Sequence, residues 1–127
     1  MKIQLAYKFT GENKEKLLEL LGKIKKILEE KHEVYIPALN KGKPVDEAEL
    51  LIDTFKHIDE ADVLIAVIKS NEKSEGMLLE IGYALGKNKK VIGVLNNEVT
   101  ETRVRGIVSE VIIFLDEEDL LNKIKDI

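Results

Sequence analysis

The chain has 127 residues, of which 44% are hydrophobic and 35% charged, a balance that fits one globular domain and excludes a disordered chain. Its net charge of -4 argues against a surface that binds nucleic acid, and the absence of cysteine excludes disulfides and a cysteine nucleophile. The longest apolar run, residues 63–68, is too short to span a bilayer, and the first residues lack the apolar region of a signal peptide, so we expect a cytoplasmic protein with no membrane partner.

The first half of the chain alternates predicted strands with predicted helices. Residues 2–7 form a short apolar run, and after Asn13 leucine and isoleucine recur at spacings of three, four and seven residues, which predicts an amphipathic helix. Residues 33–36 are predicted as a second strand, followed by a loop that contains proline and glycine. Helical spacing returns from Asp46 onward and predicts a second helix.

The second half of the chain repeats this alternation. Residues 62–68 are apolar and rich in β-branched side chains without polar alternation, which is typical of a strand covered on both faces in a parallel sheet. A third helix is predicted around residues 77–85, followed by strands at residues 90–95 and 110–115 and a closing helix at residues 116–127.

Five strands joined by helical or loop crossovers predict one α/β domain over residues 1–127. We expect a three-layer fold of the flavodoxin or Rossmann type, with a five-stranded parallel sheet and helices on both faces. In such folds ligands bind beyond the carboxyl ends of the strands. This rule directs attention to the loops at residues 7–11, 36–43, 69–76 and 96–102.

The segment at residues 70–84 contains the richest set of candidate functional residues. Ser74 suits a helix N-cap, and Gly76 leaves the amides of the first turn open to an anion. Glu80 lies about 100° from the centre of the buried stripe, at the edge of the core, where a carboxylate is partly desolvated. Spacing alone leaves another interpretation open, in which Glu80 is a solvated surface residue and Ser74 is a cap and nothing more.

Four motifs in this part of the chain resemble a known family. They are ADVLIAV at residues 61–67, Ser74-x-Gly76, EIGYALGK at residues 80–87 and VIGV at residues 91–94. Together they resemble the core of the nucleoside 2-deoxyribosyltransferase family, and within it the branch of 2'-deoxynucleoside 5'-phosphate N-hydrolases. The resemblance implies that Glu80 is the nucleophile and that Ser74 contacts a 5'-phosphate.

The same resemblance implies a second catalytic carboxylate, an Asp in the helix before the third strand that protonates the leaving base. The family pattern places this acid at Thr54, and the nearest carboxylates are Asp53 and Asp59. Asp53 is the candidate, although a shift of one residue turns a side chain by about 100° on a helix.

The remaining candidate substrate-binding residues lie around this core. The loop after the first strand offers Tyr7 either to cover the base or simply to pack, Lys8 either to hold a phosphate or to stay in solvent, and Gly11 as its turn glycine. The candidate hydrogen-bond donor to the nucleophile is Tyr83 or a hydroxyl of the ligand, and a packing role for Tyr83 stays open. Thr102 lies in the loop after the fourth strand, through which a neighbouring subunit completes the site in the family, and the resemblance therefore implies a homodimer or larger homo-oligomer.

The implied reaction is cleavage or transfer of the N-glycosidic bond of a (deoxy)nucleoside 5'-monophosphate or nucleoside through a covalent glycosyl-Glu80 intermediate. It needs no cofactor and no metal, and His32 and His57 suit the surface of a helix better than a metal site. Three rival hypotheses stay open: NAD cleavage by a TIR-like domain, nucleotide binding without turnover, and a structural oligomerisation domain.

Overall fold

The structure is a computed structural model that describes residues 1–8, 13–37, 39 and 46–127. Helices and strands alternate along the chain. In chain order the elements are β1 (Lys2–Tyr7), α1 (Lys14–Leu28), β2 (Glu33–Tyr35), α2 (Glu47–Glu60), β3 (Val63–Ile68), α3 (Glu75–Gly86), β4 (Lys90–Asn96), the short 3-10 helix η1 (Val104–Gly106), β5 (Glu110–Phe114) and α4 (Glu117–Ile124).

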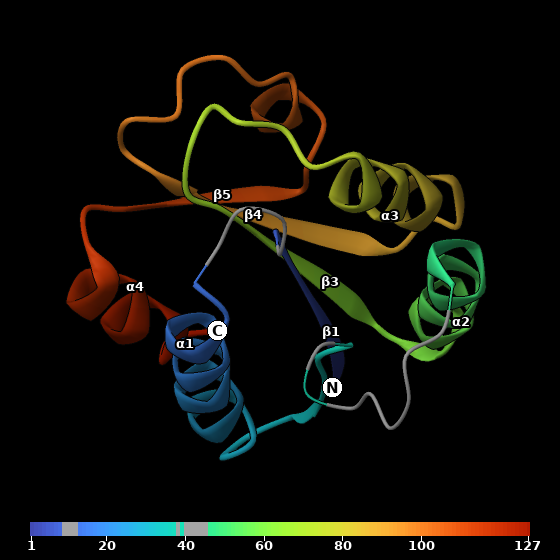
Figure 1. Ribbon diagram of the computed structural model, residues 1–127, viewed down its shortest axis with the longest axis horizontal. Helices are drawn as coiled ribbons and strands as arrows, with labels where there is room; N and C mark the ends of the chain where they lie inside the picture. Colours follow the sequence, from blue (N-terminus) through green and yellow to red (C-terminus); the bar gives the residue numbers. More distant parts are fainter. Residues whose placement is uncertain (9–12, 38, 40–45) are drawn as a thin grey trace.

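Within these described residues the strands form one five-stranded parallel sheet in the order β2-β1-β3-β4-β5. Figure 1 shows α1 and α4 on one face of the sheet and α2 and α3 on the other. The predicted three-layer α/β fold is confirmed. The chain moves outward from β1 to β2 and then returns to β3 on the other side of β1, so the connection order reverses between β1 and β3. Ligands bind at such a reversal in open α/β sheets.

Polar side chains fix the start of each α-helix. Asn13, Asp46, Ser74 and Asp116 each accept a hydrogen bond from a backbone amide two or three residues further along the chain. These caps agree with the helix starts expected from the sequence. The closing helix is shorter than predicted, because α4 ends at Ile124.

The apolar core is split into two layers by the sheet. Large aliphatic side chains from α1 and α4 fill the space on one face of the sheet, whereas α2 and α3 pack on the other face against smaller strand residues such as Ala6 and Ala66. No helix in the described ranges is both long enough and apolar enough to cross a membrane. The smaller strand residues leave room beside α2 and α3, and most of the candidate site lies on this face.

Candidate active site

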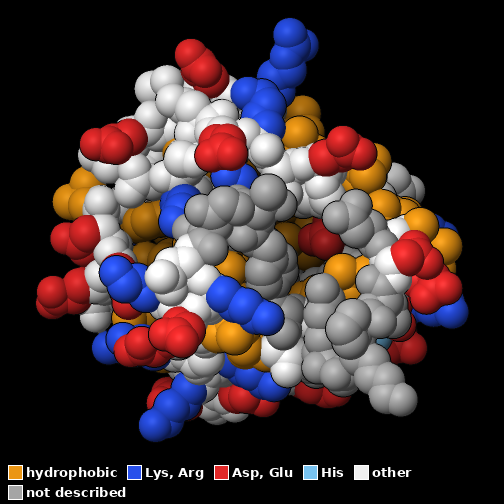
Figure 2. Space-filling view, in the orientation of Figure 1, with side chains coloured by type: hydrophobic (Ala, Val, Ile, Leu, Met, Phe, Trp, Pro, Cys, Tyr) orange, Lys and Arg blue, Asp and Glu red, His pale blue; other side chains and the backbone are white. Residues whose placement is uncertain are grey.

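A cavity of about 550 Å³ opens at the carboxyl end of β1, bordered mainly by α2 and α3 and also by Leu21 of α1. We call it the main cavity. Its walls include residues 5–8 of β1 and the turn after it, residues 72–77 at the start of α3, and Glu80. Figure 2 shows an acidic side chain set back from the surface among hydrophobic ones, right of the centre of the view. The cavity therefore lies where the strand order reverses.

Glu80 is half-buried on α3 and lines the main cavity. Burial raises the pKa of Glu80 from 4.5 to about 7, because a desolvated carboxylate resists ionisation. Among the residues that the structure describes, none donates a hydrogen bond to this carboxylate. A carboxylate in a cavity that has a raised pKa and no hydrogen-bond donor among the described residues is suited to react with a ligand.

Ser74 and Gly76 bring the N-terminus of α3 to the same cavity. The Ser74 hydroxyl accepts a hydrogen bond of 3.3 Å from the amide of Met77 and so caps the helix. A Cβ atom at Gly76 would meet nothing within 4 Å, so packing within the chain does not require glycine there. The absence of a side chain leaves the first-turn amides accessible, and such amides attract anions.

Lys8 lies directly after β1, and its side chain is buried. Its Nζ atom is 2.9 Å from a carboxylate oxygen of Glu72, which belongs to the loop after β3. Both residues line the main cavity. The two segments that flank the reversal of strand order are thus joined by an ion pair at the cavity wall.

A second cavity of about 500 Å³ is also bordered by this ion pair. Its walls come from the loop after β3, from α3 and from residues 101–104 after β4, and it shares Lys8, Glu72 and Ser74 with the main cavity. Thr102 lines this second cavity, and its hydroxyl accepts a 3.2 Å hydrogen bond from the amide of Val104 at the start of η1. The sequence-predicted Thr102 is therefore near the site but on the wall of the second cavity.

Two residues that the sequence analysis did not single out hold the loops after β3 and β4 together. The Asn71 side-chain oxygen accepts hydrogen bonds from the amides of Thr100 and Glu101, at 2.9 and 3.0 Å. Lys73 Nζ donates a 2.8 Å hydrogen bond to the carbonyl of Glu101. Both residues lie in the loop at residues 69–76, which was marked because ligands bind beyond the carboxyl ends of the strands. Their hydrogen-bond partners are about 30 residues away along the chain, so no local sequence pattern indicates these bonds.

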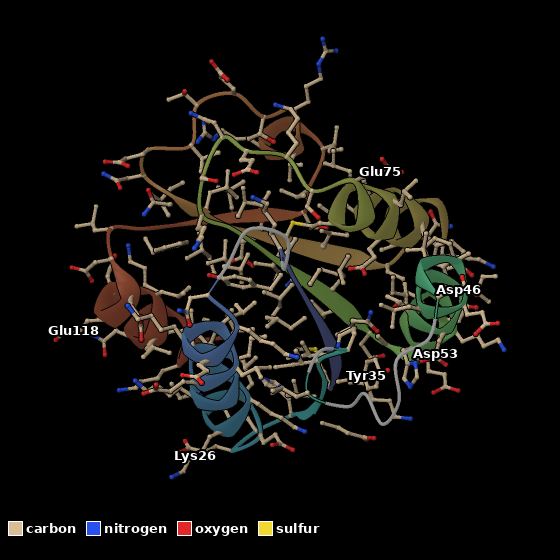
Figure 3. The ribbon with its side chains drawn as sticks, in the orientation of Figure 1. Lys26, Tyr35, Asp46, Asp53, Glu75 and Glu118 are labelled. Carbon is tan, nitrogen blue, oxygen red and sulfur yellow. The ribbon has the colours of Figure 1, made fainter. Side chains whose placement is uncertain are left out.

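Asp53 lies on the outer side of α2, away from the residues that line the main cavity. Its carboxylate accepts a 3.3 Å hydrogen bond from the hydroxyl of Tyr35, and Figure 3 shows these two labelled residues side by side. Burial and the Asp53 carboxylate together raise the pKa of Tyr35 to about 12. The buried neighbour Thr54 lines the main cavity instead. The position at which the resemblance places the acid, Thr54, is thus in the cavity wall, but its side chain carries a hydroxyl instead of a carboxylate.

Tyr83 does not interact with Glu80. Its hydroxyl donates to both carboxylate oxygens of Asp59, at 2.8 and 3.0 Å, and its ring stacks on Phe55 with ring centroids 4.3 Å apart. This hydrogen bond raises the pKa of Tyr83, with burial as a smaller cause. Tyr83 fastens α3 to α2 and lines neither cavity.

The structure gathers four of the substrate-binding candidates at the main cavity, namely Tyr7, Lys8, Ser74 and Gly76. Gly11 falls outside the described residues. The geometry therefore supports the assembly of Glu80 with Ser74 and Lys8 around one cavity. It leaves Asp53 and Tyr83 away from that group and Thr102 on the wall of the adjoining second cavity.

The sequence profile of the family described as nucleoside 2-deoxyribosyltransferase matches residues 7–112. A comparison with curated protein sequences gives no match. Among solved structures, the chain is similar to a CMP N-glycosidase from Clostridium botulinum, with 24% identity, a TM-score of 0.75 and coverage of 97% of this chain and 96% of the other. It is also similar to a 2-deoxyribosyltransferase from Bacillus psychrosaccharolyticus, with 22% identity, a TM-score of 0.72 and coverage of 96% and 91%. At these identities the structural likeness concerns the fold.

Proposed function

Because the chain belongs to the nucleoside 2-deoxyribosyltransferase family, we propose that it cleaves or transfers the N-glycosidic bond of a (deoxy)nucleoside 5'-monophosphate or nucleoside, with Glu80 as the nucleophile. Membership of this family supports glycosyl transfer or cleavage as the class of reaction. The observation that carries the finer proposal is the half-buried Glu80 carboxylate, which lines the main cavity with its pKa raised to about 7.

The proposed reaction has two steps, as in retaining glycosidases. A Glu80 carboxylate oxygen forms a bond to C1' of the sugar while the C1'–N bond breaks, and the bonding electron pair leaves with the base, which takes up a proton. Water, or the nitrogen of a second base, then attacks C1' and releases the Glu80 carboxylate. With a pKa of about 7, about half of the molecules carry the ionised nucleophile at neutral pH.

We assign the phosphate end of the ligand to the N-terminus of α3. Support comes from the Ser74 hydroxyl, the open first turn at Gly76 and the buried ammonium of Lys8, which all border the main cavity. Tyr7 borders the same cavity and is the proposed contact for sugar or base.

The proton for the leaving base is assigned from the sequence to Asp53. This assignment stays a prediction, and it has no support from geometry, since Asp53 faces Tyr35 on the outer side of α2. The same observation favours a second candidate function, nucleotide binding without turnover. A family member that has no general acid at the cavity keeps the binding pocket but cannot protonate the leaving base.

We further propose that the working form is a homodimer. Leu78 and Leu79 on α3, next to the cavities, leave more than two fifths of their surfaces exposed. Exposed large apolar side chains beside a site favour coverage by a partner chain. Sedimentation velocity at micromolar concentration is expected to give twice the mass of the chain, and a single species of monomer mass would reject the dimer.

The covalent step is tested by mass spectrometry after incubation with a 2'-fluoro-2'-deoxynucleoside 5'-monophosphate, in which the fluorine slows release of the glycosyl group. We expect an added glycosyl mass on the tryptic peptide of residues 74–87, located at Glu80 by fragmentation. The matched control is Glu75→Gln, which alters a second carboxylate of the same peptide and the same cavity and keeps the adduct, whereas Glu80→Gln loses it.

Base release is followed separately by chromatography with deoxynucleoside monophosphates and with NAD. Release from the monophosphates supports the proposal. Release from NAD alone favours the TIR-like alternative, and nucleotide binding without release from either compound favours the non-catalytic module.

A further inference from the structure

Lys8 is the one charged side chain that is buried within the described part of the chain. Burying an ammonium group is costly unless polar partners surround it. An ammonium has three hydrogen-bond donors, but a single partner, Glu72, lies near it among the described residues. Lys8 therefore retains donor capacity at the wall shared by the two cavities.

The partner of Lys8 is held loosely. The side chain of Glu72 is 72% exposed, whereas that of Lys8 is 10% exposed. The backbone of Glu72 is fixed by a 3.3 Å hydrogen bond from its amide to the Ser70 hydroxyl, but its carboxylate lies largely in water. An ion pair with such an exposed member contributes little to stability, so its carboxylate can be exchanged for a better ligand at small cost.

The position of the pair makes such an exchange relevant to ligand binding. Lys8 and Glu72 border the main cavity together with Ser74 and Gly76 at the N-terminus of α3. An anionic group that enters this part of the cavity meets an ammonium already occupied by a carboxylate. Two anions at one ammonium repel each other, and a phosphate dianion offers more charge and more acceptor oxygens than a carboxylate.

We propose that Glu72 is a built-in competitor for Lys8, which the 5'-phosphate of the ligand displaces when it binds. Glu72 then lowers the affinity for phosphorylated ligands and leaves the affinity for unphosphorylated ones unchanged, so it sets the selectivity between them. The inference rests on the proposed function for the choice of a nucleoside 5'-monophosphate as ligand. The displaced carboxylate moves into the solvent that already surrounds most of its surface.

The test is isothermal titration calorimetry at pH 7.5 with 2-deoxyribose 5-phosphate, and with 2-deoxyribose as the uncharged probe. We expect Glu72→Gln to bind the phosphate about fivefold more tightly than the parent and Lys8→Met to bind it at least about tenfold more weakly. The matched control is Glu101→Gln, which removes the same charge from an exposed residue that borders the second cavity but not the main one, and it is expected to stay within about twofold of the parent. Binding of the uncharged sugar does not change in any variant.

The proposal is overturned if Glu72→Gln binds the phosphate no more tightly than the parent, if Glu101→Gln tightens binding to the same extent, or if neither the parent nor Glu72→Gln binds it. Circular dichroism checks the fold of each variant. If Lys8→Met does not fold, the comparison of Glu72→Gln with Glu101→Gln decides alone, because both positions are exposed. Tighter binding by Glu72→Gln without base release from any nucleotide would uphold this inference and reject the glycosidase. Base release without tighter binding would do the reverse.

Discussion

The face of the sheet under α1 and α4 is filled by large aliphatic side chains, whereas the face under α2 and α3 combines small apolar residues with buried polar groups. On the first face Leu21, Ile24 and Ile65 are fully buried. On the second, Ala6 follows the buried amide of Gln4 along β1. Dense apolar packing stabilises a fold, while small and polar residues leave space and dipoles for a ligand. The site therefore lies mostly on the face under α2 and α3, although Leu5, Leu21 and Ile36 of the other layer also border the main cavity.

The strongest test of the site on the α2 and α3 face is Glu80→Gln, which removes the proposed nucleophile but keeps the shape of the side chain. We expect base release to fall by about 10³-fold or more, as when other covalent catalysts lose their nucleophile. Measurement of kcat with a deoxynucleoside monophosphate checks the loss. A variant that retains a tenth of the parent rate would remove Glu80 from the mechanism.

The same substitution is also expected to change the free energy of unfolding, and the raised pKa of Glu80 determines the direction of that change. The folded state holds the Glu80 proton up to a pH of about 7, whereas the unfolded chain releases it near 4.5, so the ionised carboxylate costs the parent stability as pH rises through this window. We expect Glu80→Gln to match the parent at pH 4 and to exceed it by about 1–3 kcal/mol at pH 8 in urea denaturation. A variant that is less stable than the parent at pH 8 would contradict a desolvated carboxylate.

The other face is tested by Ile24→Ala on α1. Ile24 is fully buried in the layer under α1 and α4 and lines neither cavity. Loss of its side chain is expected to lower the free energy of unfolding by about 3 kcal/mol, with base release per folded molecule unchanged. Denaturant unfolding measures the loss of stability, and an assay of base release at low temperature measures the activity of the folded molecules. A large loss of kcat in fully folded protein would show that the two layers are not independent.

The pH profile of the reaction is expected to follow the ionisation of Glu80. Because the nucleophile must be ionised and burial raises its pKa to about 7, kcat/KM is expected to rise about tenfold between pH 6 and pH 8. The second proton of a substrate phosphate leaves near pH 6, so an unphosphorylated nucleoside serves as the control. A flat profile over this range for both substrates would contradict the proposed protonation state.

A smaller effect is expected at Gln4, which lies on the α2 and α3 side of β1. Both polar atoms of its buried side-chain amide lack a hydrogen-bond partner within the described structure. Gln4→Met keeps the length of the side chain and removes the unpaired amide, and we expect a gain of about 1 kcal/mol in the free energy of unfolding. Thermal and urea unfolding check it, and a loss of stability would show that the amide has a partner, such as a bound water.

The order of elements and the helix starts could be predicted because their causes are local. Runs of β-branched residues mark the buried strands, and Asn13, Asp46 and Ser74 cap the helices that follow them. The half-buried position of Glu80 also followed from its angle to the buried stripe of its own helix.

The partners of the polar side chains could not be predicted in the same way. The ion pair of Lys8 with Glu72 joins residues that are 64 positions apart, and the hydrogen bond from Tyr83 to Asp59 depends on how α3 packs on α2. Sequence motifs place a residue on an element, but tertiary packing selects the group that it faces. The expected support of Glu80 by Tyr83 failed for this reason.

The smallest effect is expected for Asp53→Asn, which tests whether Asp53, the general acid assigned from the sequence, takes part in the reaction. The side chain of Asp53 is 55% exposed and bonds to Tyr35, so we expect Asp53→Asn to change kcat/KM for base release by less than about threefold. Thr54→Asp is the paired variant, because it places a carboxylate at the position that lines the main cavity. If Asp53→Asn instead lowers the rate by about 100-fold, the size expected for loss of a general acid, Asp53 must reach the substrate through a rotation of α2 that also breaks its bond to Tyr35. Loss of the raised Tyr35 pKa on ligand binding, followed by ultraviolet titration of tyrosine, would then detect that rotation independently.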